Sequence, residues 1–329
     1  MPVLTLEEAR DRVAGALGRA NTSPANAQSV AAALVAAEAD GLKGHGLTRV
    51  ASYAAQAKAG KVDGMAKPAL TRRAPGVLAI DAGHGFAYPA IDAALEALPD
   101  VARGQGIAMA GIFRSHHCGA AGHPVERLAE AGLVALLFAN TPAAIAPWGG
   151  SRAVFGTNPI AFACPVDGAA PIVVDLSLSK VARGNIVAAR QRGEPIPEGW
   201  ALDAAGQPTT DPDAALRGTM LPLGDAKGTA LALMVELLAA GLTGANYAAE
   251  ASSFLDAEGP PPGTGQLIIA MDPASFGAGT GRFAALARSI EEQAGARLPG
   301  TRRLALRRRA RQDGLSVSAS LLEEIESAG

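Results

Sequence analysis

The stretch GIAMAGIFRSHHCGAAGHPVERLAEAGLVALLFAN (residues 106–140) has the pattern of a strand, a turn, a helix and a second strand. Its two apolar runs, GIAMAGIF and LVALLFAN, are typical of strands, and the segment between them is typical of a helix. Similar β-type runs occur at VLAID (77–81), PIVVDLS (171–177) and QLIIAMD (266–272), and Ala-rich helical segments alternate with them. This alternation predicts an α/β layer.

The turn in this stretch lacks the fingerprint of an ordinary dinucleotide-binding domain. No strand-like run in the chain is followed by the motif G-x-G-x-x-G, which lets a backbone turn approach a pyrophosphate. The nearest candidate, FGAGTGRF (276–283), has arginine where the last glycine should stand. We therefore exclude an ordinary Rossmann domain.

Residues outside the α/β layer favour helices. TLEEARDRVAGAL (5–17) opens on a threonine cap, and TSPANAQSVAAALVAAEADG (22–41) opens on Ser-Pro and closes on glycine. At 329 residues the chain exceeds the size at which one core usually divides. We predict a helical domain of residues 1–68, joined by the C-terminal tail 285–329, and an α/β domain of residues 69–284. The Pro/Gly-rich segment 248–264 is expected to be a surface excursion.

Composition excludes several classes of protein. With 29 basic and 31 acidic residues the net charge is −2, so the chain lacks the basic excess of a dedicated nucleic-acid binder. Its longest uncharged apolar run is far shorter than the roughly 20 residues of a membrane helix. The N-terminus has early acids and no signal-peptide pattern, and Cys118 and Cys164 are too few for a disulfide framework. We expect a cytoplasmic protein with reduced thiols and no membrane contact.

The histidine cluster His116, His117, Cys118 and His123 has three alternative interpretations. Zinc is disfavoured, because adjacent histidines point in different directions and the spacing fits no common ligand pattern. We therefore predict no metal. The turn between strand and helix, with glycines such as Gly119, could instead present backbone amides to a phosphate. Histidines that are simply satisfied within a turn are equally compatible with the sequence.

A second cluster lies in GHGLTRVASY (44–53). If a helix begins near His45, then His45, Arg49 and Tyr53 share one face. Histidine can deliver a proton and arginine can bind a carboxylate through two parallel hydrogen bonds. A helix cap beside a solvated arginine would explain the same spacing.

Four further segments carry polar groups with two possible uses. The turn Gly-Thr-Asn-Pro (156–159) and the strand end with Asp175, Ser177 and Ser179 could bind ligand hydroxyls or form local turns and caps. Lys227 stands where a helix starts, which suits an anion. Arg302 and Arg303 follow a Pro-Gly turn in a basic run, which could bind a phosphate or form a solvated face.

The order of these motifs is similar to that of a known family. DGLKGHGLTRVASYAAQAKAGKVDG, SHHCGAAGHPVERLAEAGLVALLFANTPAAIAPWGG, FGTNPIAFACP, DLSLSKVARGN, PLGDAKGTALALMVELLAAGLTG and GTGQLIIAMDP resemble the malate/L-lactate dehydrogenase-type nicotinamide oxidoreductases. The resemblance covers residues 5–315 and is strongest to the Δ1-piperideine-2-carboxylate/Δ1-pyrroline-2-carboxylate reductases. It implies a non-Rossmann nicotinamide-binding α/β domain beside a helical domain, in a homodimer with the site near the subunit interface.

The resemblance also implies roles for individual residues. His45 becomes the proton donor, Arg49 the substrate carboxylate clamp and Thr157 part of the substrate-contacting turn. Tyr53 is a further candidate for substrate contact, from the spacing alone. The family usually has serine and aspartate where this chain has Gly44 and Asn185, and we count Asn185 with His45 among the candidate catalytic residues. Neither replacement can hold a proton or a negative charge, so a Ser-His-Asp relay is missing. The positions that match cofactor contacts are His117, Cys118, Gly119, Asp175, Ser177, Ser179, Lys227, Gly300, Thr301, Arg302 and Arg303.

The expected activity is reduction of a cyclic imino acid, Δ1-pyrroline-2-carboxylate or Δ1-piperideine-2-carboxylate, with NADPH as the cofactor and NADH as a possible substitute. A cyclic imine is easily protonated, so it needs less acid catalysis than a ketone and tolerates the missing relay. The alternative within the family is a 2-hydroxy-acid dehydrogenase of the malate, lactate, ureidoglycolate or sulfolactate type. A catalytically silent protein that binds a small molecule is the distant alternative.

Overall fold

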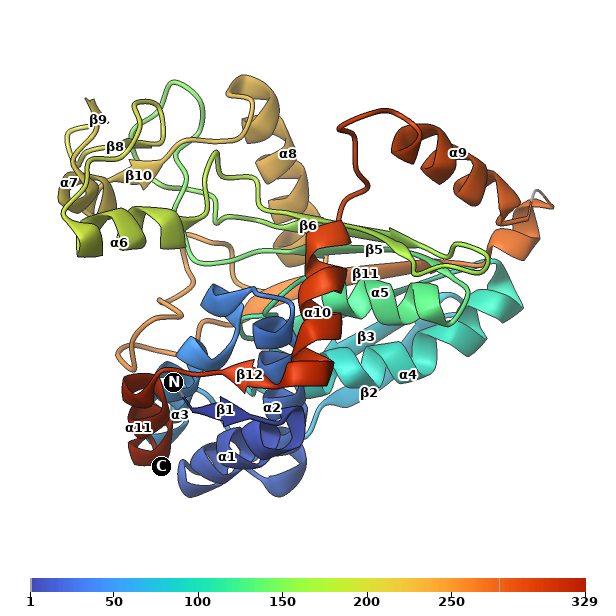
Figure 1. Cartoon of the computed structure of the whole chain (residues 1–329), viewed down its shortest axis with the longest axis horizontal. Coiled ribbons are helices and arrows are strands. Elements are labelled where there is room, and N and C mark those ends of the chain that lie inside the picture. The colour runs from blue at the N-terminus through green and yellow to red at the C-terminus, as the bar shows by residue number, and fades with distance from the viewer. Residues whose placement is uncertain (1, 278) are drawn as a thin grey trace.

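The strand–turn–helix–strand stretch lies in the middle of a seven-stranded mixed sheet (Figure 1). The computed structural model describes residues 2–277 and 279–329. The sheet order is β2-β3-β4-β11-β5-β6-β7, so the C-terminal strand β11 lies between β4 and β5. Among these strands only β3 and β4 pair in parallel. The strands are β2 (Ala69–Ala74), β3 (Val77–Asp81), β4 (Ile107–Ser115), β5 (Val134–Ala139), β6 (Ile160–Cys164), β7 (Ile172–Leu176) and β11 (Thr264–Met271).

Helices cover both faces of this sheet. On one face α4 (Ala87–Gln105) and α5 (Gly122–Glu130) pack against alternate strand residues such as Ile112 and Leu137. On the other face α8 (Ala226–Glu236) and the π turn η3 (Leu237–Gly241) pack against the residues that point the opposite way. Because successive strand residues alternate in direction, the apolar runs serve two cores. The predicted α/β fold is therefore confirmed.

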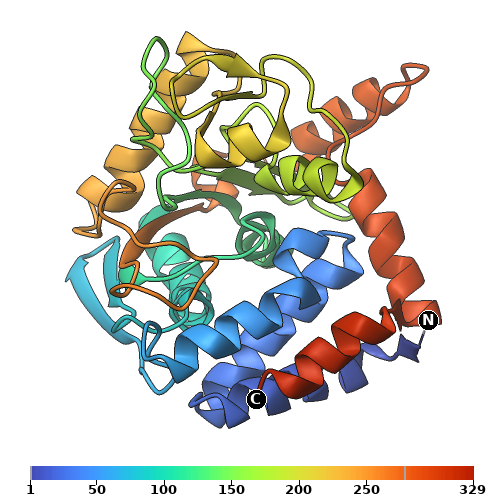
Figure 2. The same cartoon turned by 90° about the vertical axis from the view of Figure 1, so that its left-hand side faces the viewer.

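The N-terminal helices and the C-terminal tail share a separate core. Thr5 and Glu8 form a capping box at α1, and Ser23 caps α2, as the sequence predicts. Figure 2 shows α11 beside these N-terminal helices, and β1 pairs with β12. The domain boundaries at residues 68 and 284 stay predictions. The elements are β1 (Val3–Leu4), α1 (Leu6–Arg19), α2 (Pro24–Ala39), the 3-10 turns η1 (Lys43–His45) and η2 (Leu47–Arg49), α3 (Val50–Lys58), α10 (Thr301–Asp313), β12 (Leu315–Ser316) and α11 (Ala319–Ser327).

A small three-stranded sheet, of order β10-β8-β9, lies beyond the end of β7 and was not predicted. Each of its strands has two residues, which is too short for a periodic pattern. None of the helices in the described parts of the chain is long and apolar enough to cross a membrane. The remaining elements are α6 (Arg183–Arg192), β8 (Ala201–Leu202), β9 (Pro208–Thr209), α7 (Pro212–Arg217), β10 (Thr219–Met220), the 3-10 turn η4 (Pro273–Phe276) and α9 (Gly281–Glu291).

Candidate active site

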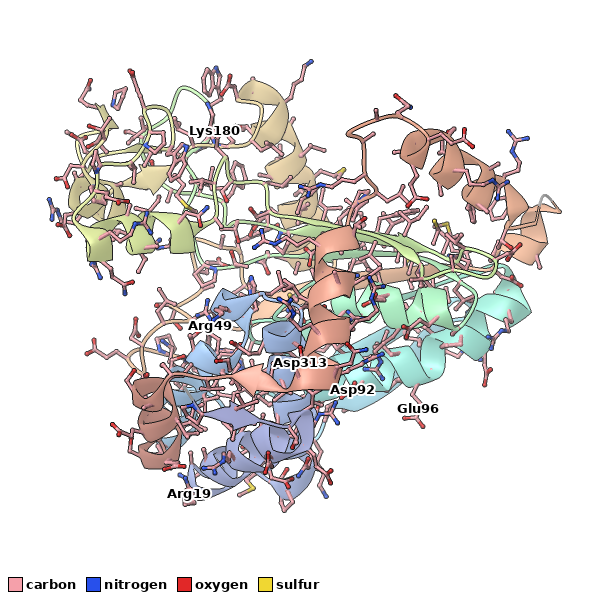
Figure 3. The ribbon with its side chains drawn as sticks, in the orientation of Figure 1. Arg19, Arg49, Asp92, Glu96, Lys180 and Asp313 are labelled. Carbon is pink, nitrogen blue, oxygen red and sulfur yellow. The ribbon has the colours of Figure 1, made fainter. Side chains whose placement is uncertain are left out.

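His45 and Arg49 end two successive 3-10 turns, η1 and η2, ahead of α3. The expectation of a helix that begins near His45 is wrong, because Gly46 interrupts it with φ −100° and ψ −141°. A Cβ at position 46 would lie 2.3 Å from the Glu38 carboxylate, so only glycine fits there. The broken turns still bring the two residues together, and Arg49 Nε donates to the Gly44 carbonyl oxygen at 2.7 Å. Figure 3 shows Arg49 at the upper edge of the helical region, below α6.

His45 lies at the edge of a cluster of rings. Its imidazole stacks on that of His117, with the ring centroids 5.2 Å apart and an angle of 20° between the planes. His117 Nδ1 lies 2.6 Å from the Tyr53 hydroxyl, which also lies 3.2 Å from the Tyr88 hydroxyl. The structure thus brings His45, Tyr53 and His117 together, although they come from two predicted motifs.

The charge state of His45 follows from this environment. Burial lowers the pKa of His45 to about 4. The positive charges of Arg49 and His123 make smaller contributions in the same direction. The imidazole is therefore neutral at pH 7. Its Nδ1 atom is buried and has no hydrogen-bond partner among the described residues. A neutral imidazole can accept a proton through one nitrogen and donate one through the other.

The histidines of the predicted cluster point to different partners. His116 Nε2 lies 2.9 Å from Gln56 Oε1, whereas His123 Nε2 lies 2.8 Å from Asp40 Oδ2. His117 contacts the Tyr53 hydroxyl, so each of the three histidines makes a hydrogen bond to a different residue. Among the residues that the structure describes, no three His, Cys, Asp or Glu side chains are arranged to hold a metal ion.

The turn that follows His117 leads into α5 as expected. Cys118 is buried, and burial raises the pKa of its thiol to about 12, so the sulfur stays protonated. Gly119 has φ +69°, and a Cβ there would lie 2.6 Å from the Tyr88 hydroxyl. At the start of α5 the Gly122 N–H donates to Asp175 Oδ2 at 2.8 Å. The structure therefore joins Asp175, at the end of β7, to this turn.

Thr157 and the two predicted serines lie close together. The Thr157 carbonyl oxygen accepts the Leu178 N–H at 2.8 Å, which places the turn beside Ser177 and Ser179, whose hydroxyls are 3.0 Å apart. Asn158 has φ +39° and its amide donates to Glu236 Oε2 at 2.7 Å. This buried hydrogen bond explains why the turn needs asparagine after threonine.

Lys227 and Asn185 lie on exposed helix starts. Lys227 stands in the first turn of α8 and is exposed. Just before α8, the Leu223 N–H donates to the Leu178 carbonyl oxygen at 2.8 Å, which ties the start of this helix to the residue before Ser179. Asn185 lies in the first turn of α6, where it lines a small cavity with Trp200. It makes no hydrogen bond to His45 in the described structure, so its catalytic role stays a prediction.

The C-terminal positions differ from one another. Gly300, with φ +84°, caps α10, and Thr301 and the exposed Arg302 begin the helix beside a cavity of about 400 Å³. Arg303, by contrast, donates to both oxygens of Glu126, at 2.7 and 2.9 Å. Its guanidinium is engaged by protein carboxylates, whereas the Arg302 side chain is exposed.

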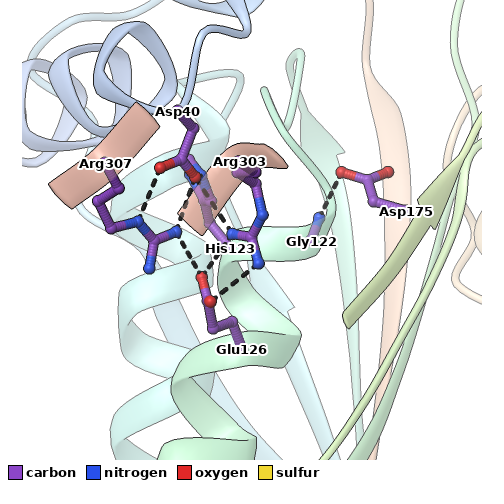
Figure 4. A network of polar contacts seen from close by, with 7 residues as sticks. All are labelled: Asp40, Gly122, His123, Glu126, Asp175, Arg303 and Arg307. Atoms are coloured by element: carbon purple, nitrogen blue, oxygen red, sulfur yellow. Dashed lines mark hydrogen bonds and ion pairs between the residues drawn. The ribbon is translucent and has the colours of Figure 1, made fainter. Parts of the chain in front are cut away.

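A buried ionic network surrounds Arg303 (Figure 4). Arg303 and Arg307 on α10 both contact Asp40 and Glu126, and His123 contacts Asp40. Burial opposes ionisation of Asp40, but the hydrogen bonds from Arg307 and His123 outweigh it and hold the pKa of Asp40 well below its usual range. Sequence reasoning missed Asp40 and Glu126, because the partners are separated by more than 170 residues.

Three other contacts were also missed. Gln56 and Lys61 reach from the helical region to the segment 248–264, and Phe254 of this segment lies against His116 and His117. Gln56 stands one helical turn after Tyr53, so helical spacing could have revealed it. Phe254 carries no local signal, because it lies in a segment without periodicity.

The residues present fit a nicotinamide dinucleotide with phosphate groups. The α5 turn and the α10 start offer backbone N–H groups, which attract phosphate oxygens at helix N-termini. The cavity beside α10 is lined by Arg297, Arg302, Arg303 and Asp40. Arg303 is paired with Asp40, so Arg297 and Arg302 supply the positive charge that suits an anion. The stacked rings of His45 and His117, both uncharged because burial lowers their pKa values, offer a flat surface against which a nicotinamide ring could pack.

Comparisons with known proteins agree over the whole chain. A model of the family described as malate/L-lactate dehydrogenase matches residues 4–326. The (2R)-3-sulfolactate dehydrogenase (NADP(+)) of Chromohalobacter salexigens is 51% identical over 99% of this chain and 97% of that protein. The Δ1-pyrroline-2-carboxylate/Δ1-piperideine-2-carboxylate reductase of Pseudomonas aeruginosa is 43% identical over 98% of each.

Solved structures show the same fold. The crystal structure of Δ1-piperideine-2-carboxylate reductase from Pseudomonas syringae pv. tomato superposes with a TM-score of 0.94 at 38% identity, over all of both chains. The sulfolactate dehydrogenase of Methanocaldococcus jannaschii gives a TM-score of 0.90 at 27% identity, over 99% of this chain and 96% of that one. These matches confirm the predicted non-Rossmann fold and the predicted class of enzyme, an NAD(P)-dependent oxidoreductase. The chain belongs to the malate/L-lactate dehydrogenase family.

Proposed function

We propose that this enzyme transfers hydride at C2 of a small 2-carboxylate, with His45 as the proton-transfer group and Arg49 as the carboxylate clamp. The observation that carries the proposal is the convergence of His45, Arg49 and the His117 wall at one end of α3. When bound, NADPH supplies the hydride, and the NADP(+) in the name of the 51% identical relative supports this cofactor. Arg49 orients the substrate, because a guanidinium pairs with a carboxylate in one plane.

Among such substrates the bare environment of His45 favours a cyclic imino acid. Burial keeps His45 neutral, and no described residue supplies a carboxylate to its Nδ1 atom. An unassisted neutral imidazole is a weak acid, so a ketone would gain little protonation from it. A cyclic imine already carries its proton on nitrogen and needs chiefly to be held and shielded from water.

A second candidate is a 2-hydroxy acid such as 3-sulfolactate. The 51% identity to a (2R)-3-sulfolactate dehydrogenase favours it, and so does the charge state of His45. Oxidation of a C2 hydroxyl needs a base, and a neutral imidazole is the form that accepts the hydroxyl proton. The same pair, His45 and Arg49, would then work in the opposite direction.

The decisive experiment is a substrate panel with each nicotinamide cofactor. Values of kcat/KM would be measured for both cyclic imines with NADPH and NADH, and for 3-sulfolactate, malate and lactate with NADP⁺ and NAD⁺. We expect at least a hundredfold preference for one class. Turnover of none of these carboxylates would contradict the proposal, and a preference for 3-sulfolactate would replace the imine as substrate.

We also propose that the enzyme is a homodimer. Helix α8 is apolar on nearly all sides, yet Leu233 and Met234 near its end and Leu237 at the start of η3 are 38–52% exposed. A helix that is apolar all round is normally buried, so a second copy of the chain is a suitable cover. Leu237→Glu should convert the dimer to a monomer in light scattering coupled to gel filtration. A wild-type monomer would contradict the proposal.

A further inference from the structure

The segment 248–264 is anchored to the helical region by two buried side chains. Lys61, 2% exposed, donates from Nζ to the carbonyl oxygen and to Oδ1 of Asp256, both at 3.0 Å. Gln56, fully buried, donates from Nε2 to the Phe254 carbonyl oxygen at 3.0 Å. Buried ammonium and amide groups are costly without partners, so these contacts hold the segment firmly. The expectation of a mere surface excursion is too simple.

Phe254 extends the ring stack that includes His45. Its centroid lies 4.9 Å from that of His116 and 5.3 Å from that of His117, which itself stacks on His45. The Phe254 side chain is 7% exposed. One ring from a segment about 200 residues away thus supports the imidazole against which His45 packs.

Gln56 also determines the tautomer of His116. Its Nε2 atom donates to the Phe254 carbonyl oxygen, so its Oε1 atom is the acceptor for His116 Nε2 at 2.9 Å. His116 therefore carries its proton on Nε2. Burial, with lesser effects of Arg49 and Lys61, lowers the pKa of His116 to about 3, which keeps the ring neutral. The Gln56 side-chain amide thus links the backbone of segment 248–264 to the ring of His116.

We propose that Phe254 is a positioning residue for the reaction, held by Gln56 and by the Lys61–Asp256 ion pair. Its ring presses His117 against His45 and closes that side of the site to water. The proposal deepens the proposed function and rests on it for the catalytic role of His45. The physical effect on the imidazoles is independent of any substrate.

The consequence of removing the ring follows from solvation. Phe254→Ala leaves a void beside two polar imidazoles, and a void with polar partners can admit water. This water would lie beside His117, whose ring covers one face of His45. It would thereby reduce the burial that disfavours the charged form of His45, so the pKa of His45 should rise towards 6.5. The groups that face His45, namely Arg49, His117 and His123, are unchanged in this variant.

The test combines histidine NMR titration with kinetics for Phe254→Ala and Phe254→Leu. We expect the pKa of His45 to rise in Phe254→Ala and to stay close to wild type in Phe254→Leu, which fills much of the void. Because a displacement of about 1 Å can cost about 100-fold in rate, kcat/KM should fall by about 10- to 100-fold. The Kd for NADPH should change by less than about twofold, since Phe254 touches histidine rings and not the phosphate positions.

Two matched controls lie on the same segment. Leu255→Ala removes a side chain that is 57% exposed, and Glu258→Gln removes an exposed charge next to Asp256; both should behave as wild type. Asp256→Asn should shift the pKa of His45 in the same direction as Phe254→Ala, but less. An unchanged pKa of His45 in a folded Phe254→Ala protein would overturn the inference. If the wild type turns over no carboxylate, the proposed function fails separately, and the titration still decides the role of Phe254.

Discussion

Replacing Asp40 by Asn should destabilise the enzyme, because Asp40 joins three elements through one carboxylate. Its oxygens accept hydrogen bonds from Arg307 at 2.7 Å, from Arg303 at 3.1 Å and from His123 at 2.8 Å. In the native network two carboxylates, Asp40 and Glu126, balance two guanidinium groups. The variant leaves two positive charges against one negative charge, while the arginine side chains stay only 12% and 17% exposed.

The magnitude follows from the burial of these groups. Loss of one partner of a buried ion pair costs about 3–5 kcal/mol, and the partial exposure of both arginines places this case near about 3 kcal/mol. An unfolding entropy of about 2.1 cal/mol/K per residue amounts to about 0.7 kcal/mol/K over 329 residues. A loss of about 3 kcal/mol should therefore lower Tm by about 4 °C.

Scanning calorimetry at pH 7.5 tests this expectation, with Asp92→Asn as the matched control. Asp92 also pairs with an arginine, Arg127, but the two side chains are 44% and 56% exposed. An exposed pair contributes less than about 1 kcal/mol, so Tm should fall by no more than about 1 °C. Equal losses of Tm in the two variants would refute the reasoning, since burial would then make no difference.

The same network predicts how stability depends on pH. The pKa values of Asp40 and Glu126 are lowered in the folded enzyme, where arginine hydrogen bonds outweigh burial, whereas unfolded carboxyls titrate near 3.8 and 4.5. Protons therefore bind more tightly to the unfolded chain, so the stabilisation is complete above about pH 5 and is lost as the pH falls below about 4. Asp40→Asn should show a shallower loss of Tm between pH 5 and pH 3 than wild type.

Four predictions concern the active site and the cofactor site. His45→Ala should lower kcat by about 10²- to 10⁴-fold for a hydroxy or keto acid and less for an imine, and near-normal turnover of both would disprove its role. In wild-type oxidation of a hydroxy acid, kcat/KM should stay flat down to about pH 4, where the pKa of His45 lies; a decline near pH 6.5 would contradict that pKa. Arg49→Lys should raise KM for the carboxylate and leave NADPH affinity intact, whereas equal weakening of both would move Arg49 to the phosphate side. Arg302→Ala should reduce kcat/KM with NADPH and change that with NADH little, while Arg303→Ala should chiefly lower Tm; equal use of NADPH and NADH by the wild type would refute the phosphate role of Arg302.

Much of the site was predictable because its chemistry is local in the sequence. His45 and Arg49 are four residues apart, and the turn from His117 to Gly119 follows directly from a strand into a helix. Residues this close in the sequence stay close in space in any fold that keeps the strand and the helix. The predicted helix at His45 failed for an equally local reason, since Gly46 has to clear the Glu38 carboxylate.

The contacts that complete the site could not be predicted, because they join distant segments. Arg303 was a candidate phosphate contact because it follows a Pro-Gly turn in a basic run. Tertiary packing instead pairs its guanidinium with Glu126, 177 residues away. Phe254 lies in a segment without helical or strand periodicity. Only the contacts of this segment with Gln56 and Lys61 bring the Phe254 ring to His116 and His117.

By itself the sequence determined the α/β class, the helix caps, the absence of the Rossmann fingerprint and the family, because each depends on neighbouring residues and their order. Only the tertiary structure decided the insertion of β11 between β4 and β5, the neutral charge state of His45 and the partners of Arg303. These features depend on burial and on distances across the chain. Local propensity contains no information about either, since the same residues in a different packing would meet water and different charges.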